Sequence, residues 1–342
     1  MRFDPSMVEG NYLRDILAQP RALEDTVAGL CEAPLPVGLE FDRIVLTGMG
    51  ASYHALHPLL IELVEHGFQA AAYETSELIY YYAAALTPGT LLIAVSQSGR
   101  SVETVRLLDL TARRVRSIGV TNTPGSPLAA RADLTVLTHA GAESSVSCKT
   151  YVSMLVALEW LGAALRGADR QGIETTLREA ATAAESYLAG WEAKVAALYE
   201  LLEGVRALFV TGRGASLAAA GTGGLILKES AHFHAEGMSC SAFRHGPFEM
   251  TGPEACVLVF AGDSRTAALN EKLVCDVRSA GGKAFLVGTQ SDADAFRIPA
   301  AADAVRPALE ILPVQLASLA LAGLAGLEPG KFRLLTKVTT IE

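Results

Sequence analysis

The sequence predicts an α/β fold in which two copies of one unit, each a parallel β-sheet flanked by helices, follow one another along the chain. Two observations lead to this prediction. Short apolar runs with the composition of buried strands alternate with segments of helical length, which is the order of a parallel sheet covered on both faces. In addition, the hexapeptide TGMGAS at 47–52 returns as TGRGAS at 211–216, which indicates an internal duplication.

Length, composition and charge limit the possible functions. The chain has 342 residues, half of them hydrophobic, which is enough for two domains with large cores. Its formal net charge is −9 and no run of Lys or Arg stands out, so we expect neither a nucleic acid nor an anionic membrane as partner. These properties predict a globular protein that acts on a small molecule.

The cysteine pattern and the N-terminus predict a cytoplasmic protein. The five cysteines are scattered without a Cys-x-x-Cys spacing, so we expect reduced thiols, no disulfide and no zinc site. The N-terminus lacks the basic-then-apolar pattern of a signal peptide. The apolar stretches are interrupted by Gly, Glu or Lys, and we expect none of them to reach membrane-spanning length.

The first repeat is predicted from strand and helix signals between residues 42 and 138. A helical segment at 6–30, with an apolar face and a break at Pro20, precedes it. Strands are predicted at 42–47, 70–73, 91–95, 117–121 and 134–138, and helices at 53–65 and 76–85.

A hydroxyl-rich turn follows the third predicted strand. It consists of Ser96, Gln97, Ser98 and Gly99, with Ser101 close behind at the start of a helical pattern. Hydroxyl and amide groups can donate hydrogen bonds there, Gly99 lets the backbone approach closely, and the free N–H groups of a helix start favour an anion. The turn is a candidate phosphate site, although serine is also a common helix N-cap.

A long helical region leads into the second repeat. Residues 152–202 have almost no strand signal and are predicted as a pair of helices that links the two halves. Strands are then predicted at 207–211, 255–260 and 283–287, in step with the first half, with a helix at 217–234.

The two halves differ at the turn that would hold phosphate. The second half has Phe260-Ala261-Gly262-Asp263 at the equivalent place, where the hydroxyls are missing and a carboxylate would repel phosphate. We therefore expect only the first half to bind the anion and the second half to supply other groups.

Three polar residues of the second half and the tail are candidates for chemistry. Glu229, between apolar positions of a predicted helix, could have the raised pKa of a general base, or could form a surface pair with Lys228. His245 could transfer protons near neutral pH, or could be a solvated loop histidine. Lys337, in an apolar and β-branched tail, could act as an amine nucleophile, or could be an ordinary surface lysine.

A metal site is not expected from the histidines of the second half. His232, His234 and Glu236 form an HxHxE pattern. On the predicted helix this spacing does not bring the three side chains to one face, so they would not converge on a metal ion.

Several short motifs occur in an order that one family shares. They are Gln19-Pro20, Gly48 to Tyr53, Ser96-Gln97-Ser98-Gly99, Thr121-Asn122 with Pro124-Gly125-Ser126, Glu143 with Val146, Gly212-Arg213-Gly214, Lys228-Glu229-Ser230, His234-Ala235-Glu236, His245-Gly246-Pro247 and Lys337-Val338-Thr339. Through them nearly the whole chain resembles the sugar isomerase (SIS) domain family, and closely the isomerase half of glucosamine-6-phosphate synthase and the SIS-type glucosamine-6-phosphate deaminases.

The resemblance implies two tandem SIS domains, each a flavodoxin-like parallel sheet flanked by helices. The predicted division is an N-terminal helical segment at 1–40, a phosphate-binding SIS domain at 41–165, linking helices at 166–204, a second SIS domain at 205–327 and a tail at 328–342 that carries Lys337.

The resemblance also implies a role for each matching residue. The phosphate would be held by Ser52, Ser96, Gln97, Ser98 and Ser101, and the substrate would also contact Gly50 and Val146. Glu229 would shuttle a proton between sugar carbons 1 and 2, His245 would assist ring opening, and Lys337 would pair with the open-chain carbonyl or form an imine with it. In the family the histidine loop comes from a second subunit, so a homodimer is expected.

The chain departs from the synthase pattern at several points. Ile226 stands where that pattern has a lysine, Arg100 replaces the usual acidic residue, and the stretch 143–149 is one residue shorter. The sequence begins at the isomerase unit, so glutamine-dependent synthesis is not expected.

These expectations lead to one main hypothesis and two alternatives. The main hypothesis is conversion of glucosamine 6-phosphate, or a related amino sugar 6-phosphate, to a ketose 6-phosphate and ammonia, without a metal or organic cofactor. One alternative is an aldose/ketose 6-phosphate isomerase. The other is a phosphosugar-binding sensor without catalysis, although no helix-turn-helix segment or basic region accompanies the two halves.

Overall fold

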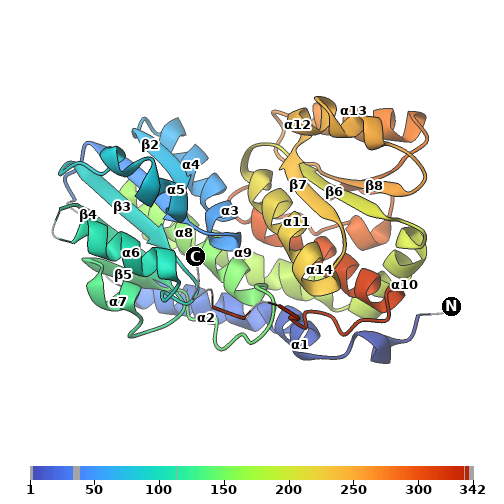
Figure 1. Cartoon of the computed structure of the whole chain (residues 1–342), viewed down its shortest axis with the longest axis horizontal. Helices are drawn as coiled ribbons and strands as arrows, with labels where there is room; N and C mark the ends of the chain where they lie inside the picture. The colour runs from blue at the N-terminus through green and yellow to red at the C-terminus, as the bar shows by residue number, and fades with distance from the viewer. Residues whose placement is uncertain (1–2, 34–38, 113, 335, 339–342) are drawn as a thin grey trace. The chain divides into compact units, whose positions relative to one another are not determined.

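The computed structural model describes residues 3–33, 39–112, 114–334 and 336–338, and the chain divides into two compact units. The first-repeat unit comprises Arg21–Ala142, Lys149–Arg178 and Leu334–Glu342. The second-repeat unit comprises Met1–Pro20, Glu143–Cys148 and Glu179–Arg333. Each unit contains one parallel sheet with helices packed on it (Figure 1). The predicted α/β class is therefore confirmed.

The sheet of the first-repeat unit has five parallel strands in the order β2-β1-β3-β4-β5. The strands are β1 (Arg43–Gly48), β2 (Ala70–Glu74), β3 (Thr90–Val95), β4 (Arg116–Thr121) and β5 (Leu134–Leu137). This is the flavodoxin-like order, in which successive connections reverse direction between β1 and β3. All six residues of β3 are buried, as expected for a central strand of a parallel sheet.

Helices cover both faces of this sheet. They are α2 (Gln19–Glu32), α3 (Ala51–His54), α4 (Leu56–Glu65), α5 (Thr75–Tyr80), α6 (Val102–Thr111), α7 (Pro127–Arg131), α8 (Lys149–Leu165) and the first part of α9 (Arg170–Leu188), with a 3-10 turn at Ala83–Ala85. Helix α4 packs against α8, whereas α5, α6 and α7 pack side by side. Beneath the second group lies a core that includes Val45, Leu92, Leu107 and Leu128.

The sheet of the second-repeat unit has four parallel strands in the order β7-β6-β8-β9, which repeats the first four positions of the first sheet. The strands are β6 (Ala207–Gly212), β7 (Ala235–Ser239), β8 (Ala255–Phe260) and β9 (Lys283–Val287). The helices of this unit are α1 (Asn11–Leu17), α10 (Trp191–Leu202), α11 (Leu217–Ala231), α12 (Cys240–Arg244), α13 (Ala267–Ser279) and α14 (Arg306–Leu324), with 3-10 turns at Pro5–Val8, Gly214–Ser216, Pro247–Met250 and Asp294–Phe296.

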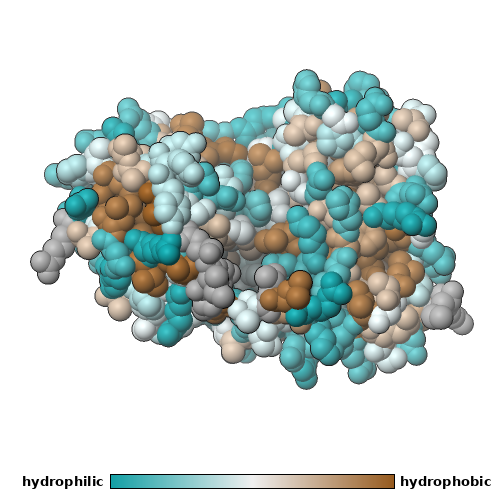
Figure 2. Space-filling model, viewed as in Figure 1, coloured by the Kyte–Doolittle hydropathy of each residue, from teal (hydrophilic) through white to brown (hydrophobic). Residues whose placement is uncertain are grey.

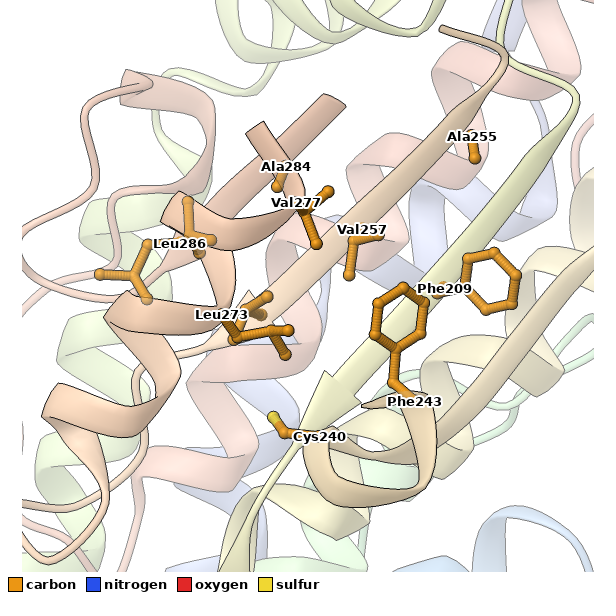
Figure 3. Close-up of a cluster of buried hydrophobic side chains, with 11 residues drawn as sticks. Phe209, Cys240, Phe243, Ala255, Val257, Leu273, Val277, Ala284 and Leu286 are labelled. Carbon is orange, nitrogen blue, oxygen red and sulfur yellow. The ribbon is translucent and has the colours of Figure 1, made fainter. Parts of the chain in front are cut away.

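One hydrophobic core of this unit lies between the sheet and the pair α12 and α13 (Figure 3). Phe209 of β6 and Phe243 of α12 meet edge to face, with ring centroids 5.2 Å apart. Leu273 and Val277 of α13 face the same cluster. This cluster is continuous inside the unit, whereas on the surface shown in Figure 2 hydrophobic residues form separate patches among hydrophilic ones.

Helix α14 is the buried helix of the second-repeat unit and packs against α10 and α11. By length and composition it could cross a membrane, with a mean hydropathy of 1.5, and it is the only such helix in the described part of the chain. The expectation that no apolar stretch reaches this length was therefore wrong. Because 94 % of that stretch is buried inside the structure, we attribute its apolar composition to packing in the core.

The start of the chain is tied to α14 by buried hydrogen bonds. Gln19 and Gln315 exchange two amide hydrogen bonds of 2.7 and 3.0 Å, and both side chains are fully buried. The hydroxyl of Tyr12 lies 3.3 Å from that of Ser318. These contacts place the first twenty residues in the second-repeat unit.

Three predicted elements differ from the observed ones. The break in the first helical segment falls at Ala18, between α1 and α2, and Pro20 lies two residues later in the first turn of α2, where its missing N–H costs nothing. The region 152–202 forms three helices instead of two, with interruptions at Gly167 and Gly190. The helix predicted at 217–234 ends at Ala231, and the following strand β7 was missed.

Candidate active site

The hydroxyl-rich turn lies at the carboxyl edge of the first sheet. Strands β1 and β3 are parallel neighbours, with Thr47 opposite Ala94, so the turns that follow them emerge at the same edge. The strand order reverses at this point, and ligands of open parallel sheets bind in the crevice that such a reversal creates. Ser52 after β1 and the segment from Ser96 to Ser101 after β3 therefore come to one place.

Hydrogen bonds within the turn fix its shape. The N–H of Gly99 donates to the carbonyl and to the hydroxyl of Ser96, both at 3.1 Å. The N–H of Arg100 donates to the hydroxyl of Ser98 at 3.2 Å. Ser101 occupies the N-cap position of α6, but its hydroxyl makes no capping bond and lies 2.7 Å from that of Thr104. The interpretation of this serine as a simple cap is therefore incomplete.

A second layer of polar groups holds the turn from below. The carbonyl of Gln97 accepts from the hydroxyls of Thr121 and Thr123, at 3.2 and 3.3 Å, and from the N–H of Asn122 at 3.1 Å. Thr121 is the last residue of β4, the next strand of the sheet, and Asn122 and Thr123 follow it. Thr121 and Asn122 belong to a motif noted in the sequence, but the sequence alone does not reveal that they support the turn.

Gly99 offers a direct test of the turn. Its φ is +60°, and a Cβ there would lie 2.2 Å from Oγ of Ser126. We expect Gly99→Ala to weaken the binding of a sugar 6-phosphate at least tenfold, about 1.4 kcal/mol, because the turn must shift. Titration calorimetry with glucosamine 6-phosphate measures this. Gly125→Ala is the control, since Gly125 has a similar φ of +68° but open space around it. Equal affinities of the two variants would contradict the expectation.

Gly50 and Ser52 shape the other side of the crevice. Gly50 has φ 52° and ψ −126°, a conformation that side chains disfavour, and it directly precedes α3. Ser52 is 8 % exposed, and its hydroxyl donates to the sulfur of Met154 at 3.5 Å. Thioether sulfur is a weak acceptor, so this hydroxyl could turn to a phosphate oxygen at little cost.

Glu229 lies half-buried on α11, between exposed Lys228 and buried Ser230. It is close enough to the fully buried phenol of Tyr12 for its charge to act there. Burial raises the pKa of Tyr12 well above its usual value, and the charges of Cys148 and Glu229 add to this effect. The carboxylate of Glu229 therefore lies within electrostatic range of the Tyr12 phenol in the second-repeat unit.

Gly330 connects three segments that carry predicted site residues. Its N–H donates to the carbonyl of Ser230 at 2.9 Å, and its own carbonyl accepts from the hydroxyl of Ser145 at 2.6 Å. Its φ is +72°, and a Cβ there would lie 2.3 Å from Oγ of Ser145 and 2.6 Å from Cβ of Tyr12. The chain leading to the tail, the helix of Glu229 and the loop of Val146 are thus held together.

The loop around Val146 is closed by a carboxylate. Oε1 of Glu143 accepts from the N–H of Cys148 at 3.0 Å. The side chain of Val146 is fully buried, so a contact of this residue with substrate would fall to its backbone.

His245 and Lys337 belong to different units. His245 is exposed, and its N–H caps α12 by donating to the carbonyls of Ser241 and Ala242. Lys337 is half-buried in the last described segment, which belongs to the first-repeat unit with the hydroxyl-rich turn. Val146, Glu229 and His245 all belong to the second-repeat unit. Thr339 of the tail motif lies outside the described residues.

The HxHxE pattern is not on a helix. His232 is the left-handed C-cap of α11, with φ 49°, and Glu236 lies on β7. His234 precedes that strand, with Nε2 3.9 Å from Oε1 of Glu236. The predicted helix was wrong here. In residues 3–33, 39–112, 114–334 and 336–338 no group of three His, Cys, Asp or Glu side chains could hold a metal ion.

The two repeats correspond to a known domain. The SIS domain model matches residues 40–164 and 201–324. The chain belongs to the SIS domain family. Each matched segment contains one of the two sheets, so the unit that is duplicated is the SIS domain.

Curated relatives of this SIS chain are longer proteins. The glutamine–fructose-6-phosphate aminotransferase (isomerizing) of Pyrococcus horikoshii is 34 % identical over 96 % of this chain and 57 % of its own length. The protein of the same name from Thermococcus kodakarensis is 30 % identical over 96 % of this chain and 58 % of its own length. The SIS chain thus spans a little over half the length of these relatives.

Solved structures share the SIS fold at low identity. The C-terminal domain of glucosamine-fructose-6-phosphate aminotransferase from Francisella tularensis matches with a TM-score of 0.82 and 21 % identity, covering 99 % of this chain and all of that one. Glucosamine-6-phosphate deaminase from Thermotoga maritima gives 0.78 and 19 %, covering 97 % and 100 %. At these identities the likeness shows the fold alone.

Proposed function

We propose that this SIS protein deaminates and isomerises an amino sugar 6-phosphate, with glucosamine 6-phosphate as the first candidate, to a ketose 6-phosphate and ammonia. The observation that carries the proposal is the hydroxyl-rich turn, which lies where the strand order of the first sheet reverses. Relatives that match almost the whole chain bear names that include fructose 6-phosphate, which supports a hexose 6-phosphate as substrate.

The proposed reaction needs no redox partner. Ring opening, assisted by His245, would expose the reacting carbons. Glu229 would take the proton from carbon 2 and return it to carbon 1, which converts the amino aldose into a ketose imine. Water would then hydrolyse the imine to the ketose 6-phosphate and ammonia. The phosphate, held by the turn that contains Ser96, Ser98 and Ser101, would keep the open chain in register.

A panel of 6-phosphorylated amino and neutral sugars tests the proposal. The expected result is ammonia release from an amino sugar 6-phosphate together with solvent exchange of the proton on carbon 2. Exchange without ammonia release from any amino sugar would favour the alternative, an aldose/ketose isomerase. Tight binding of glucosamine 6-phosphate without turnover would favour the sensor.

Lys337 separates deamination from isomerisation. If its amine pairs with the carbonyl as an imine, Lys337→Ala should abolish ammonia release and spare the interconversion of the two hexose 6-phosphates. Both rates are measured on the same preparation. Lys331→Ala is the control, because Lys331 lies six residues earlier in the sequence, in the other unit, and is exposed and paired with Glu328 at 2.8 Å. Equal loss of both activities in Lys337→Ala would contradict the imine role.

We further propose a cytoplasmic homodimer in which His245 of one subunit serves the phosphate-binding turn of the other. The exposed position of His245 supports this proposal. Neither a membrane nor a nucleic acid is proposed as a partner, because the net charge is −9 without basic runs. Sedimentation at micromolar concentration should give twice the mass of one chain; a monomeric mass in a fully active preparation would contradict the shared site.

A further inference from the structure

The second-repeat unit has a cavity of its own at the carboxyl edge of its sheet. Its volume is about 140 Å³, and it is lined by the turns after β8 and β9, the segment 298–301 and the start of α14. Gly262, Gly288 and Thr289 come from the two turns, and Arg306 and Glu310 come from α14.

The cavity lies where the duplication would place a second ligand site. The order β7-β6-β8-β9 reverses between β6 and β8, as the first sheet does between β1 and β3. Ser216 follows β6 and Gly262 follows β8, so the two turns flank the reversal. Fully buried Asn270 fixes the second turn by donating to the carbonyl of Ala261 at 3.0 Å. Crevices of this kind bind ligands in parallel sheets.

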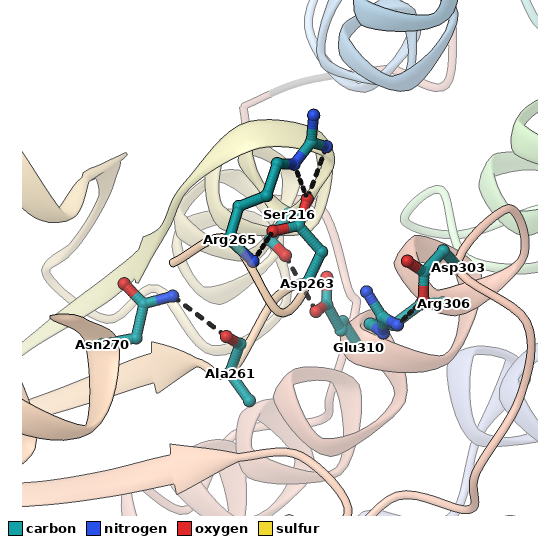
Figure 4. A network of polar contacts seen from close by, with 8 residues as sticks. All are labelled: Ser216, Ala261, Asp263, Arg265, Asn270, Asp303, Arg306 and Glu310. Atoms are coloured by element: carbon teal, nitrogen blue, oxygen red, sulfur yellow. Dashed lines mark hydrogen bonds and ion pairs between the residues drawn. The ribbon is translucent and has the colours of Figure 1, made fainter. Parts of the chain in front are cut away.

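Glu310 is a buried carboxyl group with one oxygen unused. Its side chain is 0 % exposed, and Oε1 accepts from the hydroxyl of Ser216 at 2.8 Å (Figure 4). Oε2 makes no hydrogen bond of normal geometry among the described residues, and the N–H of Gly262 is the backbone group whose dipole acts on this carboxyl. A buried polar atom in this state is costly to the fold, and a ligand that donates a hydrogen bond would remove the cost.

The other charges near the cavity are already paired. Asp263 accepts from Nε of Arg265 at 2.8 Å and from its N–H at 2.9 Å. Arg306 pairs with Asp303 and lies one helical turn before Glu310. The repulsion of phosphate that the sequence predicted for Asp263 is therefore reduced by Arg265. Among the described residues, however, the lining has no unpaired cation to hold a dianion.

The walls and the size favour an uncharged ligand with hydroxyl groups. Apolar walls come from Val287, Ile298, Pro299 and Leu309. Carbohydrates combine such apolar faces with hydroxyls that both donate and accept hydrogen bonds. An apolar cavity of about 150 Å³ holds one benzene ring, so this cavity has room for about six non-hydrogen atoms. A cavity of this size would hold part of a sugar ring, and the rest of the ring would lie at the opening of the cavity.

We propose that this cavity is a second ligand site, which takes neighbouring hydroxyls of an unphosphorylated sugar or polyol, one donating to Oε2 of Glu310 and another accepting from Arg306. The site belongs to the second-repeat unit alone and does not depend on the proposed reaction.

Glucose and inorganic phosphate are the probes for the test. Saturation-transfer difference NMR on the full chain should show glucose binding in the millimolar range, unchanged when saturating glucosamine 6-phosphate is present. Glu310→Leu removes the acceptor and Ala301→Phe fills the cavity, and each should weaken glucose binding about tenfold or more. Stronger binding of inorganic phosphate than of glucose at this site would overturn the proposal.

Two control variants test whether the loss of glucose binding is specific to this cavity. Glu159→Gln changes a largely buried carboxyl group of the first-repeat unit, and Ser98→Ala weakens the phosphate-binding turn; neither should affect glucose binding. Displacement of glucose by glucosamine 6-phosphate, or unchanged affinity in Ala301→Phe, would overturn the proposal. If Glu310→Leu fails to fold, the Ala301→Phe variant and the displacement experiment still test whether glucose binds in this cavity, because both leave Glu310 in place.

Discussion

Replacement of Glu229 by Gln is expected to lower the turnover of the amino sugar phosphate by about 10²- to 10⁴-fold, the range of general acid–base catalysis. The amide has the size of the carboxylate but cannot accept the proton from carbon 2. Glu229 lies on α11 next to Ser230, whose hydroxyl donates to the carbonyl of Ile226 at 2.7 Å and whose carbonyl accepts from the N–H of Gly330.

The substitution should separate chemistry from binding. Proton exchange at carbon 2 and ammonia release should fall together, whereas calorimetric affinity for the sugar phosphate should stay within about threefold, because phosphate binding is assigned to the other unit. Glu236→Gln is the matched control, since Glu236 lies on β7 and its side chain is 47 % exposed. A Glu229→Gln enzyme that keeps more than a tenth of the turnover would exclude this residue as the base.

The free energy of unfolding should decrease as the pH rises from about 4.5 to about 7. In the Glu310→Gln variant this decrease should be much smaller. Burial raises the pKa of Glu310 from 4.5 to about 7; the hydroxyl of Ser216, the charge of Arg306 and the N–H of Gly262 act against burial, and Asp263 adds to it. In this range the unfolded chain loses its proton while the folded protein keeps it, so rising pH favours unfolding.

The expected size follows from the pKa difference. A pKa shift of this extent corresponds to a contribution of about 3 kcal/mol to the free energy of unfolding. This contribution is fully present below pH 4.5 and is lost above pH 7. Urea unfolding at pH 5 and pH 8 should therefore show Glu310→Gln close to the wild type at pH 5 and more stable at pH 8. Parallel stability curves of the two proteins would contradict the assignment.

Two further variants complete this experiment. Burial and the charge of Glu62 raise the pKa of Glu159 to about 7, with Arg166 acting against them, so Glu159→Gln should show a similar trend in the first-repeat unit. Glu254→Gln is the comparison with an exposed carboxyl group, because its side chain is 64 % exposed and paired with Arg206.

The sequence allowed most of the sheet architecture to be predicted. Central strands such as β3 and β8 are buried at every position, so they read as continuous apolar runs. Strand β7 was missed because Ala-Glu-Gly-Met-Ser has no such run. It lies at the edge of its sheet, where Glu236 and Gly237 are exposed. The same error extended α11 by three residues and placed two histidines on a helix.

A site could be predicted from the sequence only where its residues are close together along the chain. The turn from Ser96 to Ser101 is one continuous segment, so its residue types and position revealed it. The Glu310 cavity is assembled from four segments and was not found. Its one sequence signal was a lone carboxylate inside the apolar run of α14, four residues after Arg306. The support of Gly330 for Ser230 could not be found either, because it depends on contacts between residues 100 positions apart along the chain.

The hydrogen bonds that Tyr12 of α1 and Gln19 of α2 make with α14 have a consequence for synthesis on the ribosome. Apart from the tail, all residues of the first-repeat unit have been made once Arg178 has emerged. Tyr12 and Gln19, however, wait for Ser318 and Gln315, which are made about 300 residues later. Until then the apolar side of the first helix has no permanent cover. Nascent chains stalled before α14 should therefore bind chaperones at their N-terminal twenty residues, and release should coincide with completion of α14.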